Sequence, residues 1–161
     1  MHFKFIRFSV LIFCLPSFVI AQELAQEFSA PLITGNEQVR LSDYRGKLVF
    51  LDFWASWCPP CLVSLPAYDK MYRELDSEDF EIIAINVDED IMDGIAFLED
   101  HPVSYPVLAD PDGEVGIPYG VRSLPVSYLI DKEGRIVQRY RSYKSGDEIL
   151  LKQLVEELLD R

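Results

Sequence analysis

Nearly continuous apolar runs alternate with amphipathic stretches along the first two thirds of the chain. Residues 47–54 and 80–87 have the length and composition of strands that are covered on both faces. Each run is followed by a segment whose apolar residues recur three and four positions apart, at 59–75 and at 90–100, and this spacing predicts helices. The alternation is typical of βαβ units, in which a right-handed crossover joins two parallel strands.

The remaining segments predict two hairpins, a short extended piece and a last helix. The further strands, in chain order, are expected at 27–33, 39–41, 105–109, 126–131 and 136–143. Ser145 and Glu148 have the spacing of a capping box, so the last helix should begin there, with leucines along one face. The whole pattern predicts one α/β domain built on a central mixed sheet with helices on both faces.

The first 21 residues follow a different pattern. A short basic start precedes an apolar stretch over residues 8–20, and Val19 and Ala21 supply compact residues at the −3 and −1 positions of a cleavage site. This layout predicts a signal peptide at 1–21, with 22–161 as the mature domain. The apolar stretch is shorter than the roughly 20 residues that a membrane span needs. We therefore favour cleavage over the alternative, an uncleaved N-terminus that tethers the protein to a membrane.

The charge of the chain narrows the choice of partners. Fifteen basic residues face 27 acidic ones, which gives a formal net charge of −12. An acidic surface repels phosphate backbones and anionic lipid, so we expect neither nucleic-acid binding nor electrostatic docking to a membrane.

The motif Trp57-Cys58-Pro59-Pro60-Cys61 lies between the first buried run and the helix that follows it. Cys14 belongs to the expected signal peptide, so only Cys58 and Cys61 remain after cleavage. A disulfide that closes so short a loop is worth only about 2 kcal/mol, which makes a structural staple a weak explanation. Zinc would need two more ligands, which only His101 and carboxylates could supply, so we expect no metal and no cofactor. Dithiol redox chemistry is the leading hypothesis.

The two cysteines are expected to have different roles. Cys58 precedes the helix and should be partly exposed, and the helix N-terminus can lower a thiol pKa from about 8.5 to about 7. Cys61 lies one turn into the helix and should be shielded. Cys58 would therefore attack a disulfide, and Cys61 would resolve the mixed disulfide that forms.

Asp52 lies in the middle of the apolar run that leads to the motif. A buried carboxylate is costly unless it is paired or protonated. Our interpretation is a buried proton acceptor that serves Cys61 through water. In the alternative, Asp52 faces out of the sheet or pairs with a lysine.

Several residues around the motif are candidates for contact with a partner. Trp57 could form an apolar rim for a docking protein, whereas Trp54 is expected in the core. Pro59 and Pro60 fall in the first helical turn, where a missing N–H group costs little. Pro125 precedes a strand, but only about 5–6% of X–Pro bonds are cis, so the residue pattern leaves its isomer open.

The segment 49–61 resembles the active-site segment of the thioredoxin superfamily, and more narrowly that of the exported TlpA-like branch, which includes the ResA and DsbE thiol-disulfide oxidoreductases. Pro66 and the pair Leu124-Pro125 resemble the kink proline and the cis-proline of that family, and the likeness covers about residues 27–160. It implies a thioredoxin-like three-layer sandwich with an N-terminal hairpin and a central insertion. It also implies a cis Pro125, with the Leu124 backbone turned toward the cysteines to pair with a substrate.

The resemblance also suggests a function. Thioredoxins carry a buried acid at the position of Asp52, whereas many TlpA-like members carry Glu where this chain has Ser64, so the acid role is expected at Asp52. We expect a periplasmic, monomeric reductant of protein disulfides with an upstream electron donor, and cytochrome c maturation is one process in which such members act. Two alternatives stay open: a thiol peroxidase, which would want a lone activated cysteine near Thr and Arg, and a non-enzymatic binding module that uses the same groove.

Overall fold

The computed structural model describes residues 23–160. The expected signal peptide, with Cys14, lies outside the described residues. Within 23–160, none of the helices combines the length and the apolar composition that crossing a membrane requires.

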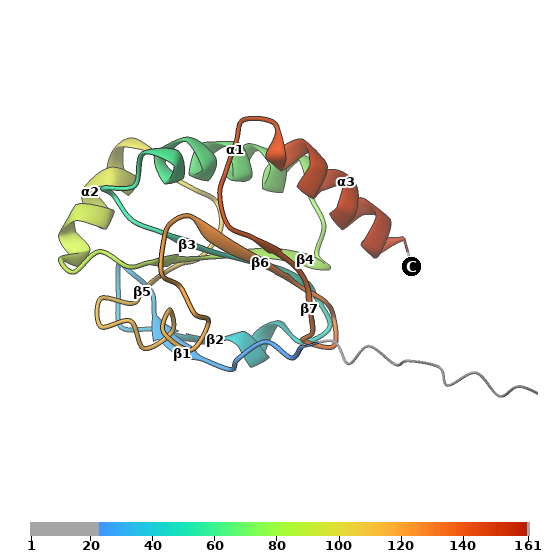
Figure 1. Cartoon of the computed structure of the whole chain (residues 1–161), viewed down its shortest axis with the longest axis horizontal. Coiled ribbons are helices and arrows are strands. Elements are labelled where there is room, and N and C mark those ends of the chain that lie inside the picture. The colour runs from blue at the N-terminus through green and yellow to red at the C-terminus, as the bar shows by residue number, and fades with distance from the viewer. Residues whose placement is uncertain (1–22, 161) are drawn as a thin grey trace, which may run out of the picture.

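A five-stranded sheet runs through the middle of the molecule (Figure 1). Its strands, in spatial order, are β5 (Val107–Ala109), β4 (Phe80–Asn86), β3 (Leu48–Trp54), β6 (Val126–Ile130) and β7 (Ile136–Tyr140). β3 pairs in parallel with β4 and antiparallel with β6, and β6 forms a hairpin with β7. The expected mixed sheet is confirmed.

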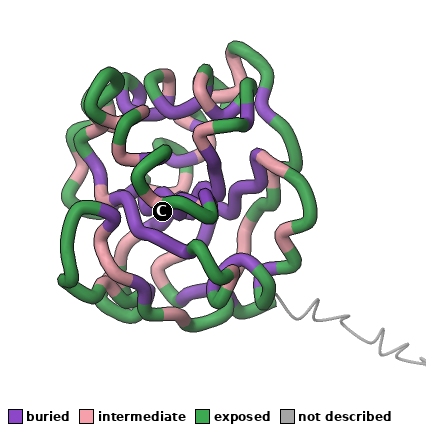
Figure 2. Tube along the Cα trace, turned by 90° about the vertical axis from the view of Figure 1, so that its left-hand side faces the viewer, coloured by how far each residue is buried: buried purple, intermediate pink, exposed green. Residues whose placement is uncertain are grey.

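Both faces of the central strand are covered, as its apolar run predicts. All seven residues of β3 are buried, and alternate side chains belong to two separate cores. Phe50 and Trp54 point into one core, and Leu51 and Phe53 into the other. Figure 2 shows the buried segments running through the middle of the molecule, with exposed loops around them.

The three α-helices within residues 23–160 cover the same face of the sheet. They are α1 (Pro59–Leu75), α2 (Ile91–Asp100) and α3 (Asp147–Leu159), and their apolar side chains share the core that contains Phe50 and Trp54. In Figure 1 they lie along the upper side of the sheet. The opposite face is covered by the hairpin of β1 (Ser29–Pro31) and β2 (Gln38–Arg40), by the short 3-10 helix η1 (Leu41–Tyr44) and by the loop 111–121.

The thioredoxin-like three-layer sandwich with its N-terminal hairpin is thus confirmed, but the expectation of helices on both faces needs correction. The right-handed crossovers β3–α1–β4 and β4–α2–β5 both run toward the β5 edge of the sheet, so α1 and α2 lie on the same face. The other face receives the turns of residues 111–120, where two prolines and three glycines disfavour a helix. The buried Asp110 carboxylate holds these turns by accepting the backbone N–H groups of Val115 at 3.0 Å and Gly116 at 2.8 Å.

The start of the last helix also differs from the prediction. α3 begins at Asp147, and its N-cap is Gly146, whose φ of 101° favours glycine. The Glu148 carboxylate accepts the Gly146 N–H at 2.9 Å and the Tyr143 hydroxyl at 2.8 Å. The predicted capping box with Ser145 is therefore wrong, because the left-handed turn at Gly146 brings a different N–H group to Glu148.

Candidate active site

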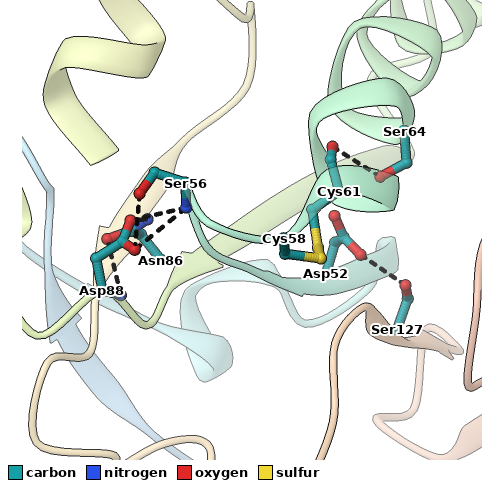
Figure 3. Close-up of a disulfide and its surroundings, with 8 residues drawn as sticks. All are labelled: Asp52, Ser56, Cys58, Cys61, Ser64, Asn86, Asp88 and Ser127. Atoms are coloured by element: carbon teal, nitrogen blue, oxygen red, sulfur yellow. Dashed lines mark hydrogen bonds between the residues drawn. A yellow bond between two sulfur atoms is a disulfide. The ribbon is translucent and has the colours of Figure 1, made fainter. Parts of the chain in front are cut away.

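The two cysteines lie where the central strand gives way to α1. Cys58 is the N-cap of the helix and Cys61 is its third residue. They are joined by a disulfide with a Cα–Cα distance of 5.3 Å, and the Cys61 N–H donates to the Cys58 carbonyl at 2.9 Å. Figure 3 shows the disulfide at the start of the helix.

The disulfide is more buried than the sequence suggested. Cys58 is 3% exposed and Cys61 is fully buried. The expectation of a partly exposed Cys58 is thus wrong for this disulfide form, because the Cys58 sulfur turns inward to bond Cys61. What little surface the pair offers belongs to Cys58.

Two prolines shape the electrostatics of this helix start. An N-cap side chain normally accepts a hydrogen bond from the N–H of the second or third helical residue. Pro59 and Pro60 occupy the first two helical positions and carry no N–H. Of those two positions only Cys61 carries an N–H group, and in the disulfide form it donates to the Cys58 carbonyl. Both prolines are exposed at the surface.

Asp52 lies in β3 on the side that faces α1. It is 1% exposed, and the strand register places it opposite Ser127 of β6. The Ser127 hydroxyl donates to its Oδ1 at 2.6 Å. In Figure 3 the Asp52 carboxyl group lies beside the disulfide. This position excludes the alternative in which Asp52 faces out of the sheet or pairs with a lysine.

The surroundings of Asp52 change its acidity. Burial raises the pKa of the carboxyl group from its usual 3.8 to about 7, and the hydrogen bond from Ser127 offsets part of that rise. A carboxyl group with this pKa can both accept and release a proton near neutral pH. Ser127 was not predicted from the sequence, although a single serine inside an otherwise apolar strand is a usable signal once the strand is aligned with β3.

The peptide bond between Leu124 and Pro125 is cis, as the family resemblance implied. Pro125 is buried just before β6, and Leu124 is half-buried. Leu124 and Trp57 line one open cavity of about 230 Å³, together with Ile117 and Val121. Trp57 and Ile117 are 66% and 72% exposed, so the sides of this cavity offer apolar surface next to the cysteine motif.

A polar cluster that was not predicted from the sequence holds the loop before Cys58. The buried Asp88 carboxylate accepts the Ser56 N–H at 3.0 Å and the Ser56 hydroxyl at 3.0 Å. It also accepts a hydrogen bond from the Asn86 side chain at 2.7 Å. Figure 3 shows this cluster on the far side of the loop from Asp52. It ties the loop to the end of β4.

Three other residues lie where the sequence placed them or close by. Trp54 is fully buried in the core, and its ring lies 5.5 Å from that of Phe97. His101 caps the C-terminal end of α2 and stacks on Phe97 at 4.6 Å. Ser64 is buried in α1 and donates to the Cys61 carbonyl at 3.1 Å, so this position brings no titratable group to the cysteines.

Comparison with known proteins identifies the family of this chain. The model of the AhpC/TSA family matches residues 21–139. The chain belongs to the AhpC/TSA family. It is 33% identical over 129 residues to the thiol-disulfide oxidoreductase ResA of Bacillus thuringiensis subsp. konkukian, covering 79% of this chain and 75% of the relative. ResA of Bacillus subtilis is 38% identical over 105 residues, covering 65% of this chain and 59% of the relative.

Solved structures that resemble this chain support the same family. A Chlorobium tepidum protein named as a thiol:disulfide interchange protein of the DsbE type superposes with a TM-score of 0.80 at 36% identity, over 86% of this chain and 96% of that one. A protein from Bacteroides thetaiotaomicron named as a protein disulfide isomerase gives a TM-score of 0.78 at 34% identity, over 87% and 90% of the two chains. This family member is therefore a thiol-disulfide oxidoreductase of the ResA and DsbE type, with the pair Cys58 and Cys61.

Proposed function

We propose that this protein reduces disulfides of client proteins outside the cytoplasm, with Cys58 as the attacking thiol and Cys61 as the resolving thiol. The observation that carries the proposal is the Cys58–Cys61 disulfide at the N-terminus of α1, with Asp52 buried beside it. A positive helix end stabilises a thiolate at the N-cap more than one a turn further in. Cys58 also holds the little surface that the closed pair exposes.

The reaction moves two electrons to the client. The Cys58 thiolate attacks one sulfur of the client disulfide, which forms a mixed disulfide and releases the first client thiolate. Cys61 then loses its proton and attacks the Cys58 sulfur. The second client thiolate leaves, and the disulfide of the oxidised protein closes. An upstream dithiol donor must reduce this disulfide before the next cycle.

Asp52 is the proposed acceptor for the Cys61 proton, through an intervening water molecule. Its pKa of about 7 leaves a substantial carboxylate fraction at neutral pH, so a proton can be taken up and later released. Trp57, Pro59 and Pro60 are proposed to contact the client from one side of the motif. Leu124 and Pro125 are proposed to contact it from the other side, with the Leu124 backbone pairing with the client chain.

The proposal also covers the cellular location and the oligomeric state of the protein. Residues 1–21 would direct export and be removed after Ala21, leaving 22–161 as a monomeric domain in the periplasm. The names of the relatives support exchange with protein disulfides. Cytochrome c maturation is the process that the family resemblance suggests, and Ser64, in place of the glutamate of many members, argues against it. N-terminal sequencing of the exported protein tests the cleavage, and an N-terminus at Met1 would contradict it.

A redox measurement tests the direction of exchange. The protein is equilibrated with glutathione buffers, and the fraction of Cys58–Cys61 disulfide is quantified by alkylation and mass spectrometry. A reductant should have a potential near that of thioredoxin, about −270 mV. A value above about −150 mV, close to the strong oxidant DsbA, would overturn the assignment as a reductant. Rapid peroxide consumption that survives Cys61→Ser would instead favour the peroxidase alternative.

A further inference from the structure

Three arginines converge on one surface cavity beside the cis-proline strand. Arg122, Arg139 and Arg141 line a cavity of about 320 Å³, together with Gly120, Ser123 and Val126. No acidic residue is among these described lining residues. In a chain with a formal net charge of −12, this concentration of positive charge is unusual.

The arginines of this cavity differ from the others in how they are paired. Every other arginine within residues 23–160 lies within 4 Å of a carboxylate, namely Arg40, Arg45, Arg73 and Arg135. In that part of the chain, neither Arg122 nor Arg141 forms a salt bridge or a hydrogen bond, and both are exposed. Arg139 is held over the Tyr128 ring at 5.1 Å and donates to the Gly120 carbonyl at 3.4 Å. One guanidinium group is thus positioned by the fold, and two are free to bind an anion.

The arginine cavity continues the surface at the cysteine motif. Arg122 and Ser123 line it and also line the apolar cavity formed by Trp57 and Leu124. A polypeptide with its cysteine at Cys58 and an apolar side chain against Trp57 would extend along this shared edge. Its next residues would meet the arginines.

We propose that the arginine cavity binds carboxylate side chains of the client, so that the protein selects disulfides flanked by acidic residues. This inference rests on the proposed function and names the client chemistry at the same site. Arginine binds carboxylates through paired N–H groups, and the three side chains offer several such groups in one place. We favour an acidic polypeptide over a phosphate ligand because the cavity shares its edge with the client-facing surface.

The overall negative charge of the protein makes a preference for acidic peptides easy to detect. A chain with a net charge of −12 repels an acidic peptide at long range, so without the cavity a neutral peptide should react faster. Local binding by the arginines would reverse that order. Exposed charge pairs each contribute a modest amount, which for two arginines corresponds to a rate effect of about three- to tenfold at low salt.

The test uses reduced protein and two peptides. Each peptide carries one cysteine joined by a disulfide to 2-mercaptoethanol, and the residues flanking the cysteine are Asp and Glu in one peptide and Asn and Gln in the other. Wild-type protein should react about three- to tenfold faster with the acidic peptide, and added salt should reduce the difference. In the double variant Arg122→Gln/Arg141→Gln the ratio should fall to one or below. Lys144→Gln is the matched control, because Lys144 is an exposed cation that does not line the cavity, and it should keep the wild-type ratio.

The outcomes separate this inference from the proposed function. If neither peptide oxidises the cysteine pair, the proposed function fails, and with it the docking role of the cavity. If both peptides react and the double variant keeps the wild-type ratio, only the arginine inference is overturned.

A second measurement does not depend on exchange. A cysteine-free acidic peptide is titrated into ¹⁵N-labelled oxidised protein, and the side-chain Nε signals of Arg122 and Arg141 are followed. These signals should shift with the acidic peptide and not with the neutral one. Signals that respond to inorganic phosphate but not to the acidic peptide would overturn the assignment to a polypeptide.

Discussion

Replacing Asp52 by asparagine should stabilise the oxidised protein, and the gain should depend on pH. The asparagine keeps an oxygen for the Ser127 hydroxyl, which donates to Asp52 at 2.6 Å, but it carries no charge at any pH. The wild-type carboxyl group is 1% exposed, so its ionisation in the folded protein carries a desolvation cost that solvent does not relieve.

The sign of the effect follows from the direction of the pKa shift. The folded-state pKa of Asp52, about 7, lies above the usual 3.8, so between these values the folded protein keeps a proton that the unfolded chain releases. Wild-type stability is therefore fully retained below about pH 4 and declines as the pH rises toward 7. At about 1.4 kcal/mol per pKa unit, the decline amounts to about 4 kcal/mol, which Asp52→Asn does not suffer.

Urea unfolding of the oxidised wild type and of Asp52→Asn, from about pH 4 to about pH 8, measures this difference. The oxidised form is used so that no thiol titrates. The variant should be close to wild type at the acid end and more stable by up to about 4 kcal/mol at the alkaline end. Ser127→Ala removes the bond that favours the charged carboxylate, so the decline should extend to higher pH in that variant. A stability difference between Asp52→Asn and wild type that stays constant over the whole range would show that Asp52 does not ionise at a cost in the folded protein.

Three further substitutions test the surroundings of the cysteines. Trp57→Ala should change the free energy of unfolding by less than about 0.5 kcal/mol, because the side chain is 66% exposed. It should slow exchange with protein disulfides, and equal slowing with a small disulfide would contradict a docking role. Asp88→Ala removes the acceptor for the Ser56 N–H and hydroxyl groups and should lower the free energy of unfolding in urea by about 3 kcal/mol. A decrease below about 1 kcal/mol would show that these hydrogen bonds do not hold the loop. Pro60→Ala adds an N–H group at the second helical position, so alkylation of Cys58 at mildly acidic pH should become several-fold faster. An unchanged rate would mean that helix N–H groups do not stabilise the Cys58 thiolate.

The sequence predicted best where local pattern and burial agree. The apolar runs of β3 and β4 could hardly form anything but buried strands, and the cysteine motif fixed the start of α1. Prediction from the sequence failed where the conformation of a turn set the start of a helix. At Gly146, a positive φ moved the start of α3 away from Ser145. The expectation of helices on both faces failed because both parallel crossovers run toward the β5 edge, so α1 and α2 lie on the same side of the sheet.

The candidate site shows the same division. Asp52 was identified from its place in an apolar strand, but its partner Ser127 depends on the antiparallel register of β3 and β6, which the sequence does not specify. The 3% exposure of Cys58 is that of the disulfide form, and the residue pattern alone does not specify this form. The arginine cavity joins Arg122 to Arg139 and Arg141, which lie on the far side of the β6–β7 hairpin in sequence, so no local motif could reveal it.

Trapping of a mixed disulfide tests most directly that Cys58 exchanges bonds with a client and Cys61 resolves the product. Reduced Cys61→Ser and reduced Cys58→Ser are each incubated with a disulfide-containing protein, and adducts are mapped by mass spectrometry without reductant. We expect a stable adduct through Cys58 in Cys61→Ser, and little adduct in Cys58→Ser because the remaining thiol is fully buried in α1. Adducts that form equally well through Cys61, or none through Cys58, would rule out this division of roles.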